Sequence, residues 1–295
     1  SHNSLGTLDY RTFLGLNNLS YLDMSNNVLK VLDHRLFNET KMLSYMDISY
    51  NNLKSLDYRL LNETSELTCL NISNNFLTSV DFRTFSVPKK LTHLNIRNNS
   101  LEILDYRTFT STTNLSYLDL SYNSMEILDH RLFNSLSNLV HLNLANNKLH
   151  PLLESILFVS QENLITLLLG YNSITTIDEQ VFTPLKSIRE LDLTGNKFVC
   201  NCRLHSTMLW CIDRALDTNA TCSHPLEVRG MSWNNASSSE MCHVGTNEHL
   251  ILVVGVGAAC FILCVVIVSI IIVYWKRRVK RKAAQLSFRR HENFF

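Results

Sequence analysis

The chain has little glycine and proline, and almost no net charge. Its 295 residues include 8 Gly and 4 Pro, and the formal net charge is +1. So little glycine and proline excludes a collagen-like chain or a Gly/Pro-rich low-complexity chain. A hydrophobic content of 45% excludes an intrinsically disordered chain. What remains is a protein with enough apolar residues to form a packed core.

The small net charge hides an uneven distribution along the chain. Residues 276–295 carry eight Lys or Arg and one Glu, which gives +7. The remaining 19 Lys or Arg and 25 Asp or Glu lie before residue 250, which gives −6. A charge-free apolar run, residues 250–273, separates the two parts. This arrangement indicates a membrane protein with two unlike sides.

One pattern, L-x-x-L-x-L-x-x-N, recurs with a period of 24 residues and a single step of 25. This spacing and pattern form the leucine-rich repeat signature. It predicts an α/β leucine-rich repeat solenoid with a parallel sheet on its concave face, in which stacked coils bury the apolar residues that no single coil can bury. The copies are residues 19–27, 43–51, 67–75, 91–99, 115–123, 139–147, 164–172 and 188–196.

Each repeated residue type has a predicted role. Alternating residues such as Leu22 and Met24 point from a short strand into the core. The Asn that ends each copy satisfies backbone groups which the following turn leaves unpaired. A later aromatic column packs at the back of the core, and it comprises Phe13, Phe37, Leu61, Phe85, Phe109, Phe133, Phe158 and Phe182.

The repeats give way to a cysteine cluster that begins Cys200-Asn-Cys202. With the later Cys222 and Cys242, it resembles the C-terminal flanking cap of extracellular leucine-rich repeat proteins. That resemblance implies disulfides Cys200–Cys222 and Cys202–Cys242, a connectivity that spacing alone cannot fix. A zinc site from the first three cysteines is the alternative, and an oxidising compartment disfavours it.

Two further cysteines fall outside that pattern. Cys69 lies in an early repeat and Cys211 lies in the cysteine cluster. Coils stacked at about 4.8 Å place them roughly 24 Å apart. A disulfide requires Cα atoms within about 7 Å. We therefore expect either that both are free or that one forms an intermolecular bond.

The first residues match the second half of a coil whose strand is missing. Asn3, Leu5, Leu8 and Phe13 occupy the corresponding repeat positions. No initiator Met or signal peptide precedes them. The sequence therefore predicts a fragment that starts within a repeat.

The apolar run predicts one transmembrane helix over residues 250–275. Its 24 uncharged residues form a helix of about 36 Å, which is enough to cross a hydrocarbon core of about 30 Å. By the positive-inside rule, the basic residues after it are cytoplasmic. We expect a single-pass type I protein of the plasma membrane, with an endosomal membrane as the alternative. Gly255 and Ala259 leave a homo- or heterodimer open.

Five segments follow from these patterns: repeats over 1–197, a Cys-rich cap over 198–242, a linker over 243–249, the transmembrane helix over 250–275 and a basic tail over 276–295. Sequons for N-glycosylation all fall on the predicted outer side, as expected for a secreted part. Asn71 lies on a strand, where a glycan would obstruct the concave face. The sequons are Asn18, Asn38, Asn62, Asn71, Asn98, Asn114, Asn219 and Asn235.

The outward strand positions are the candidate ligand-binding face. Tyrosine, Asn and Asp on a rigid frame resemble the composition of an antibody paratope. The carboxylates favour a basic or polyhydroxylated partner, although Asp in this motif could merely solvate the strand. Leu168, with Val140 and Ile165, predicts a hydrophobic contact. The candidates are Tyr21, Asp23, Tyr45, Asp47, Tyr50, His93, Arg97, Tyr117, Asp119, Tyr122, His141, Leu168 and Tyr171.

An Asp-x-Arg motif recurs on the opposite side of the coils. It predicts a solvated ladder of ion pairs between coils, each worth little. The paired Asp column cancels the field of the Arg column, so no nucleic-acid partner is expected. The motif occurs at Asp9/Arg11, Asp33/Arg35, Asp57/Arg59, Asp81/Arg83, Asp105/Arg107 and Asp129/Arg131.

Residues 1–275 resemble an extracellular leucine-rich repeat receptor, with Toll-like receptors and variable lymphocyte receptors as the nearest families. The resemblance implies recognition of a protein or microbial-surface ligand in innate immunity. A Toll-like receptor would also have a cytosolic TIR domain, which residues 276–295 lack. An adhesion or decoy protein without its own signalling is the alternative. No catalytic motif is present, so we expect no enzyme activity, cofactor or metal.

Overall fold

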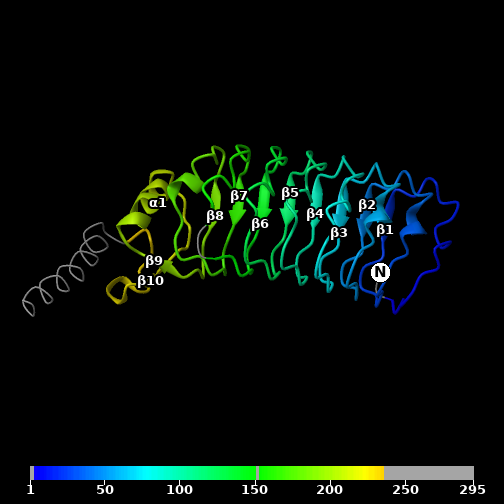
Figure 1. Ribbon diagram of the computed structural model, residues 1–295, viewed down its shortest axis with the longest axis horizontal. Helices are drawn as coiled ribbons and strands as arrows, with labels where there is room; N and C mark the ends of the chain where they lie inside the picture. Colours follow the sequence, from blue (N-terminus) through cyan, green and yellow to red (C-terminus); the bar gives the residue numbers. More distant parts are fainter. Residues whose placement is uncertain (1–2, 151–152, 236–295) are drawn as a thin grey trace, which may run out of the picture. The chain divides into compact units, whose positions relative to one another are not determined.

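Short parallel strands, one from each repeat, form the main sheet. The computed structural model describes residues 3–150 and 153–235. Within them, eight strands pair in chain order (Figure 1). They are β1 Tyr21–Asp23, β2 Tyr45–Asp47, β3 Cys69–Asn71, β4 His93–Asn95, β5 Tyr117–Asp119, β6 His141–Asn143, β7 Thr166–Leu168 and β8 Glu190–Asp192. The parallel-sheet solenoid predicted from the repeat is therefore confirmed.

The strand register aligns equivalent residues of neighbouring repeats. Tyr21 pairs with Tyr45, and Asp23 pairs with Asp47. The same one-to-one register continues to β8. Since side chains alternate across a strand, the middle residue of each strand points into the core and the two outer residues point to the other side of the sheet. We call the surface made by these outer residues the sheet face.

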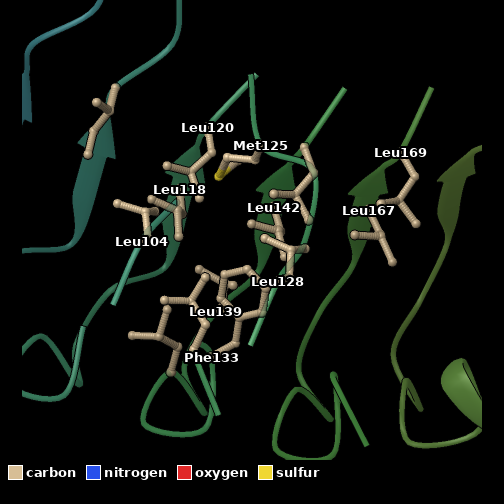
Figure 2. Packing of buried hydrophobic residues seen from close by; sticks show 14 of the residues in the cluster. Leu104, Leu118, Leu120, Met125, Leu128, Phe133, Leu139, Leu142, Leu167 and Leu169 are labelled. Carbon is tan, nitrogen blue, oxygen red and sulfur yellow. The ribbon is translucent and has the colours of Figure 1, made fainter. Parts of the chain in front are cut away.

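The interior is a continuous stack of leucines backed by aromatic rings. Leu118, Leu142 and Leu167 lie on β5, β6 and β7 with no exposed surface, and Phe133 lies deeper in the same cluster (Figure 2). The Phe133 ring stacks on Phe158 with 6.1 Å between ring centroids. The predicted aromatic column is buried except for Phe13, which is half-buried. The expected core is thus confirmed.

The Asn that ends each repeat forms an internal ladder of hydrogen bonds. Asn51 Nδ2 donates to the carbonyls of Met24, Ile48 and Ser49 at 3.0–3.2 Å. Its Oδ1 accepts from the Leu29 amide at 3.0 Å. One amide therefore satisfies backbone groups in its own coil and in the preceding coil, as predicted from the turn that follows each strand.

Opposite the sheet, several coils contain short 3₁₀ helices. They are η1 His34–Phe37, η2 Tyr58–Leu61 and η3 Glu179–Val181. Asp33 begins η1 because its carboxylate accepts the Arg35 amide at 2.9 Å. This is the bond of a helix N-cap, and it explains why Asp precedes each of these turns.

The ion pairs of the Asp-x-Arg motif lie within coils, which corrects the predicted ladder between coils. The guanidinium of Arg107 donates to both carboxylate oxygens of Asp105, at 2.9 and 2.7 Å. The two residues are only two positions apart, and the N-cap bond already holds Asp105 in place. An Arg therefore reaches its own Asp more easily than the Asp of a neighbouring coil.

Arginine connects neighbouring coils through aromatic rings instead. The Arg107 guanidinium carbon lies 3.8 Å from the centroid of the Phe82 ring in the preceding coil. Arg83 lies 3.7 Å from Tyr58, and Arg131 lies 3.8 Å from Tyr106. Exposed cation–π contacts contribute roughly 0.5–1 kcal/mol each. The arginine column therefore stabilises the stacking of coils through these cation–π contacts, while its ion pairs lie within each coil.

Acid should weaken this column. The Arg107 side chain lowers the pKa of Asp105 to about 2, below the unfolded value of about 3.9. A lowered folded-state pKa stabilises the fold above the unfolded pKa, and this stabilisation is lost as the pH falls from about 4 to about 2. We expect Arg107→Gln to lose less thermal stability across this window than the wild-type chain. Circular dichroism melts at several pH values would measure the difference, and equal losses would contradict the assignment.

After β8 the chain forms a different local structure: β9 Phe198–Val199, helix α1 Cys202–Asp213, β10 Cys222–His224 and the 3₁₀ helix η4 Leu226–Val228. Asn201 begins α1 by accepting the Arg203 and Leu204 amides. The Trp210 ring lies 5.7 Å from the Phe182 ring of the last coil. Thr207 donates to the Ile177 carbonyl at 2.7 Å. Helix α1 therefore packs against the core of the last repeat.

The cysteines in this segment are mostly paired. Cys200 and Cys222 form a disulfide with Cα atoms 5.6 Å apart. Cys202 is also disulfide-bonded, while its expected partner, Cys242, lies outside the described residues. Cys69 and Cys211 are free thiols, which agrees with the distance argument against a bond between them.

The predicted linker, transmembrane helix and basic tail, together with Gly255 and Ala259, lie outside the described residues. In the part of the chain that is described, no helix has the length and apolar character needed to cross a membrane.

Candidate functional site

Aromatic rings stack along the sheet face at the first residue of several strands. The rings of Tyr21 and Tyr45 are nearly parallel, with centroids 4.4 Å apart. The Tyr117 ring stacks on His141 at 4.6 Å and on His93 at 5.8 Å. Cys69 separates the two groups, because β3 has a thiol where its neighbours have a ring. The sequence placed these residues on one face, but it did not show that their rings cover one another.

Ring stacking determines what this surface can offer to a partner. Tyr21 and His93 are exposed, whereas Tyr45, Tyr117 and His141 are half-buried. Neighbouring rings cover both faces of Tyr117 and one face each of Tyr21, Tyr45, His93 and His141. Cross-strand aromatic pairs contribute roughly 0.2–1 kcal/mol each. The result is a stiff surface of hydroxyl and imidazole groups with little side-chain freedom to lose on binding.

Burial changes the proton affinity of these groups. Burial is the main cause that raises the pKa of Tyr45 to about 12 and raises the pKa of Tyr117. Burial also lowers the pKa of His141, opposed by the charges of Asp119 and Glu190. The tyrosines therefore remain hydroxyl donors at physiological pH, and His141 is held towards its neutral form.

The Asp and Asn residues of the sheet face have a local structural role. Asp119 Oδ1 accepts the Ser121 amide at 2.8 Å, and Asn143 Oδ1 accepts the Ala145 amide at 3.0 Å. This is the Asx-turn bond, in which a side chain completes the turn two residues on. The equivalent bonds of Asp23, Asp47, Asn71, Asn95 and Asp192 follow the same pattern.

These contacts limit the carboxylates as ligand-binding groups. Asp119 is buried, with 4% of its surface exposed. Asp47 accepts bonds from the Ser49 amide and hydroxyl and from Asn71 Nδ2. The expectation that Asp forms a freely available acidic face is therefore too simple. The Asp and Asn side chains of this column mainly shape the turns.

Leu168 interrupts the Asp and Asn column between Asn143 and Asp192, its register partners. It has no side-chain oxygen to form the turn, and the second residue after it is Gly170. A Cβ on Gly170 would lie 2.8 Å from Asp192 Oδ2. A side chain at position 170 would therefore require the Asp192 carboxylate to shift.

The three candidate tyrosines beyond the strands occupy a left-handed backbone position. Tyr50, Tyr122 and Tyr171 have φ values of 51°, 54° and 54° and exposed side chains. Arg97 covers the Tyr122 ring, with its guanidinium carbon 4.2 Å from the centroid. Tyr171 lies over Gly195 of the next coil, where a Cβ would be 2.7 Å from the ring. The tyrosines project beside the sheet face from fixed turns.

A depression borders the sheet face just before β6, β7 and β8. It has a volume of about 670 Å³, and Val140, Ile165, Lys186 and Arg189 are among its lining residues. Val140 directly precedes His141, so the depression adjoins the ring column. Val140 and Ile165 therefore line one depression together. Two cations, and not Leu168, are among the residues that line it with them. Neither cation was predicted as part of the site, although Arg189 occupies the same repeat position as Val140 and Ile165.

The sequons differ in accessibility. Asn71 is half-buried, and both atoms of its side-chain amide are engaged: Nδ2 with Asp47 and Oδ1 with the Ser73 amide. Asn18, Asn38, Asn62, Asn98, Asn114, Asn219 and Asn235 are exposed. A glycan at Asn71 would therefore project from a half-buried strand position, whereas the other seven asparagines are exposed, with Nδ2 already bonded at Asn98 and Asn114.

The described residues contain no group of three or more His, Cys, Asp or Glu side chains placed to hold a metal ion. The chemistry of the sheet face is that of hydrogen bonding and ring contact.

A family model of leucine rich repeats matches residues 1–53, 65–125, 89–149 and 152–198. These ranges cover more than half of the chain. The chain therefore belongs to the leucine-rich repeat family. No curated protein sequence gives a significant match.

Several solved structures have the same fold. Human 5T4 (Wnt-activated inhibitory factor 1, trophoblast glycoprotein) has a TM-score of 0.66 and 21% identity, covering 78% of this chain and 89% of that one. The TLR13–ssRNA13 complex has a TM-score of 0.60 and 26% identity, covering 65% and 28%. The Drosophila Toll–Spatzle complex has a TM-score of 0.53 and 20% identity, covering 80% and 47%. This chain thus spans less than half of the TLR13 and Toll chains.

Proposed function

We propose that this chain is the extracellular recognition part of a non-enzymatic, single-pass cell-surface receptor that binds a protein ligand on the sheet face. The observation that carries the proposal is the stacked ring column on β1, β2, β4, β5 and β6. These positions point to solvent, where the repeat needs no aromatic residue: Thr166 and Glu190 occupy the same position on β7 and β8.

The chemistry of this surface suits a protein partner. Tyrosine and histidine give large contact areas and hydrogen bonds with few rotatable bonds, so little entropy is lost on binding. The depression beside β6–β8 adds the apolar side chains of Val140 and Ile165 and the cations Lys186 and Arg189. An apolar centre with a polar rim is the usual composition of a protein interface. A microbial-surface ligand and a role in innate immunity are narrower proposals that the resemblance to Toll-like receptors suggests.

A nucleic-acid ligand fits this surface less well. The TLR13 structure contains single-stranded RNA, but binding to a phosphate backbone requires an excess of Lys and Arg. Asp23, Asp47 and Asp119 lie on the same face as the ring column. Their charges oppose the approach of a polyanion.

The test replaces two of these tyrosines with threonine, because Thr166 occupies the same position on β7. We expect the double variant Tyr45→Thr, Tyr117→Thr to lose at least about tenfold in affinity for its ligand, the loss expected when central aromatic contacts of an interface are removed. The full chain would be displayed on cells and screened against an arrayed panel of soluble extracellular proteins. Binding of each positive protein to both forms would then be compared by titration.

The chain offers a matched control on another surface. Ile103 and Ile127 are exposed by 69% and 66%, and Ser55 and Ser79 occupy the same repeat position in other coils. The double variant Ile103→Ser, Ile127→Ser should bind like the wild type. If a ligand bound normally to the tyrosine variant but weakly to the isoleucine variant, its binding site would lie away from the sheet face.

A further inference from the structure

A second depression lies beside the turns that follow β2, β3 and β4, and its lining contains no charged residue. It has a volume of about 400 Å³, and Tyr50, Asn52, Asn74, Phe76, Asn98 and Ser100 contribute to it. The Tyr50 and Phe76 side chains are exposed by 56% and 53%. Two exposed rings therefore border a group of neutral amides.

The repeat itself does not require these rings. Asn74 and Asn98 occupy the repeat position of Tyr50 in the next two coils, with the same left-handed backbone. Ser100 and Ser124 occupy the position of Phe76 in the coils that follow. The two coils that follow therefore accept polar residues at both positions, so the rings are not needed to form these turns.

Exposed rings and neutral amides together fit an uncharged sugar. An aromatic face removes the apolar C–H side of a sugar ring from water, while amide groups donate and accept hydrogen bonds with its hydroxyls. The lining has no Lys or Arg for a phosphate and no carboxylate for a cation. The chemistry therefore favours a neutral carbohydrate over a charged ligand.

A sequon for N-glycosylation lies in this depression. Asn98 begins the sequon Asn98-Asn99-Ser100, and both Asn98 and Ser100 are exposed. Asn98 Nδ2 donates to Asn74 Oδ1 at 2.7 Å, so the amide is held towards the preceding coil. We propose that Asn98 carries an N-linked glycan whose first sugar occupies the depression against Phe76. This inference rests on the extracellular placement proposed above.

The attachment reaction is compatible with the observed bond. Asn98 Nδ2 forms a bond to C1 of the first sugar, the bond from C1 to the diphosphate of the lipid-linked sugar donor breaks, and Nδ2 loses one of its two protons. The remaining N–H can still donate to Asn74 Oδ1. The sugar is then attached to an amide whose orientation is already fixed, which reduces the entropy lost when it settles against the ring.

The location of this glycan has a consequence for binding. Asn98 lies in the turn beyond β4, three residues after Asn95, the last residue of the strand. A sugar held in the depression would cover the edge of the coils and leave the stacked rings of the sheet face open. A glycan at Asn71, by contrast, would lie on β3 among the candidate ligand-binding residues.

The test measures how well the folded protein protects each glycan. The full chain would be produced behind a cleavable secretion leader in cultured animal cells, and site occupancy would be measured by glycopeptide mass spectrometry. We expect Asn98 to be occupied and its glycan to be released by a peptide N-glycosidase several-fold more slowly than the glycan at exposed Asn114. After denaturation the two sites should be released at similar rates.

A variant removes the rings and keeps the sequon. In Tyr50→Asn, Phe76→Val, both new residues already occur at the same repeat positions, in Asn74 and Val28, so the fold should be retained, and neither change creates a new sequon. Release at Asn98 should then rise to the rate at Asn114, which should not change. Equal rates in the wild type, or an empty Asn98 beside occupied Asn18 and Asn114, would overturn the proposal and leave the receptor function standing. If every sequon is empty, the extracellular placement is wrong, and this proposal with it.

Discussion

Phe109→Ala should lower the free energy of unfolding by about 3–5 kcal/mol, the usual cost of removing a buried aromatic side chain. Phe109 has no exposed surface, and its ring stacks on Phe85 at 6.2 Å between centroids. The cavity would open between two coils, so the contacts of both are lost. Urea denaturation followed by circular dichroism would measure the change.

The chain supplies the control for this substitution. Leu61 occupies the same repeat position and is 2% exposed, so an aliphatic residue can fill this part of the core. Phe109→Leu should therefore cost no more than about 2 kcal/mol. Because each coil contacts only its neighbours, hydrogen exchange should increase first in the coils next to residue 109. A uniform increase along the whole solenoid would contradict this local picture.

The repeat period was sufficient to predict the architecture of the core. A period of 24 residues places Leu94, Leu118 and Leu142 at the same depth, since one coil is stacked on another without a change of register. The ladder Asn and the aromatic column follow from the same argument. Each is a question of which face a residue occupies, and periodicity answers such questions directly.

Periodicity does not reveal which of two neighbouring groups a side chain will contact. Arg107 could reach an Asp in its own coil or in an adjacent coil, and the N-cap bond of Asp105 decides in favour of its own coil. Asp119 was placed correctly on the sheet face, yet a hydrogen bond to the Ser121 amide gives it a structural role. Short-range geometry of this kind depends on rotamers, which the spacing of residues does not specify.

The candidate site shows the same limit. Tyr117 and His141 were expected on one surface, but the sequence could not show that stacking would cover their ring faces. Of the residues that line the depression beside β6–β8, only Val140 and Ile165 were predicted from the sequence to lie together. Arg189 occupies the same repeat position as Val140 and Ile165, so periodicity does place it beside them, whereas Lys186 precedes the eighth copy, where no periodic pattern marked it.

Asn123→Ala should be about as damaging as the loss of a core aromatic residue, although it removes a polar side chain. Asn123 Nδ2 donates to the carbonyls of Ile96, Leu120 and Ser121, and its Oδ1 accepts the Leu101 amide. Each buried polar group left without a partner costs about 1–3 kcal/mol. We expect a loss of at least about 3 kcal/mol in the free energy of unfolding, because several such groups are exposed at once to an apolar interior.

A substitution at an exposed Asn serves as the control, because it removes a side-chain amide without leaving buried backbone groups unpaired. Asn138 is exposed, and its Nδ2 donates to the Thr113 carbonyl at 3.0 Å. Water can replace that bond, so Asn138→Ala should cost less than about 1 kcal/mol. Asn123→Asp should resemble Asn123→Ala, since a carboxylate keeps an acceptor for the Leu101 amide but faces three carbonyls without a proton to donate. If urea denaturation gave the same stability for Asn123→Asp as for the wild type, the donor side of the ladder would have no stabilising role.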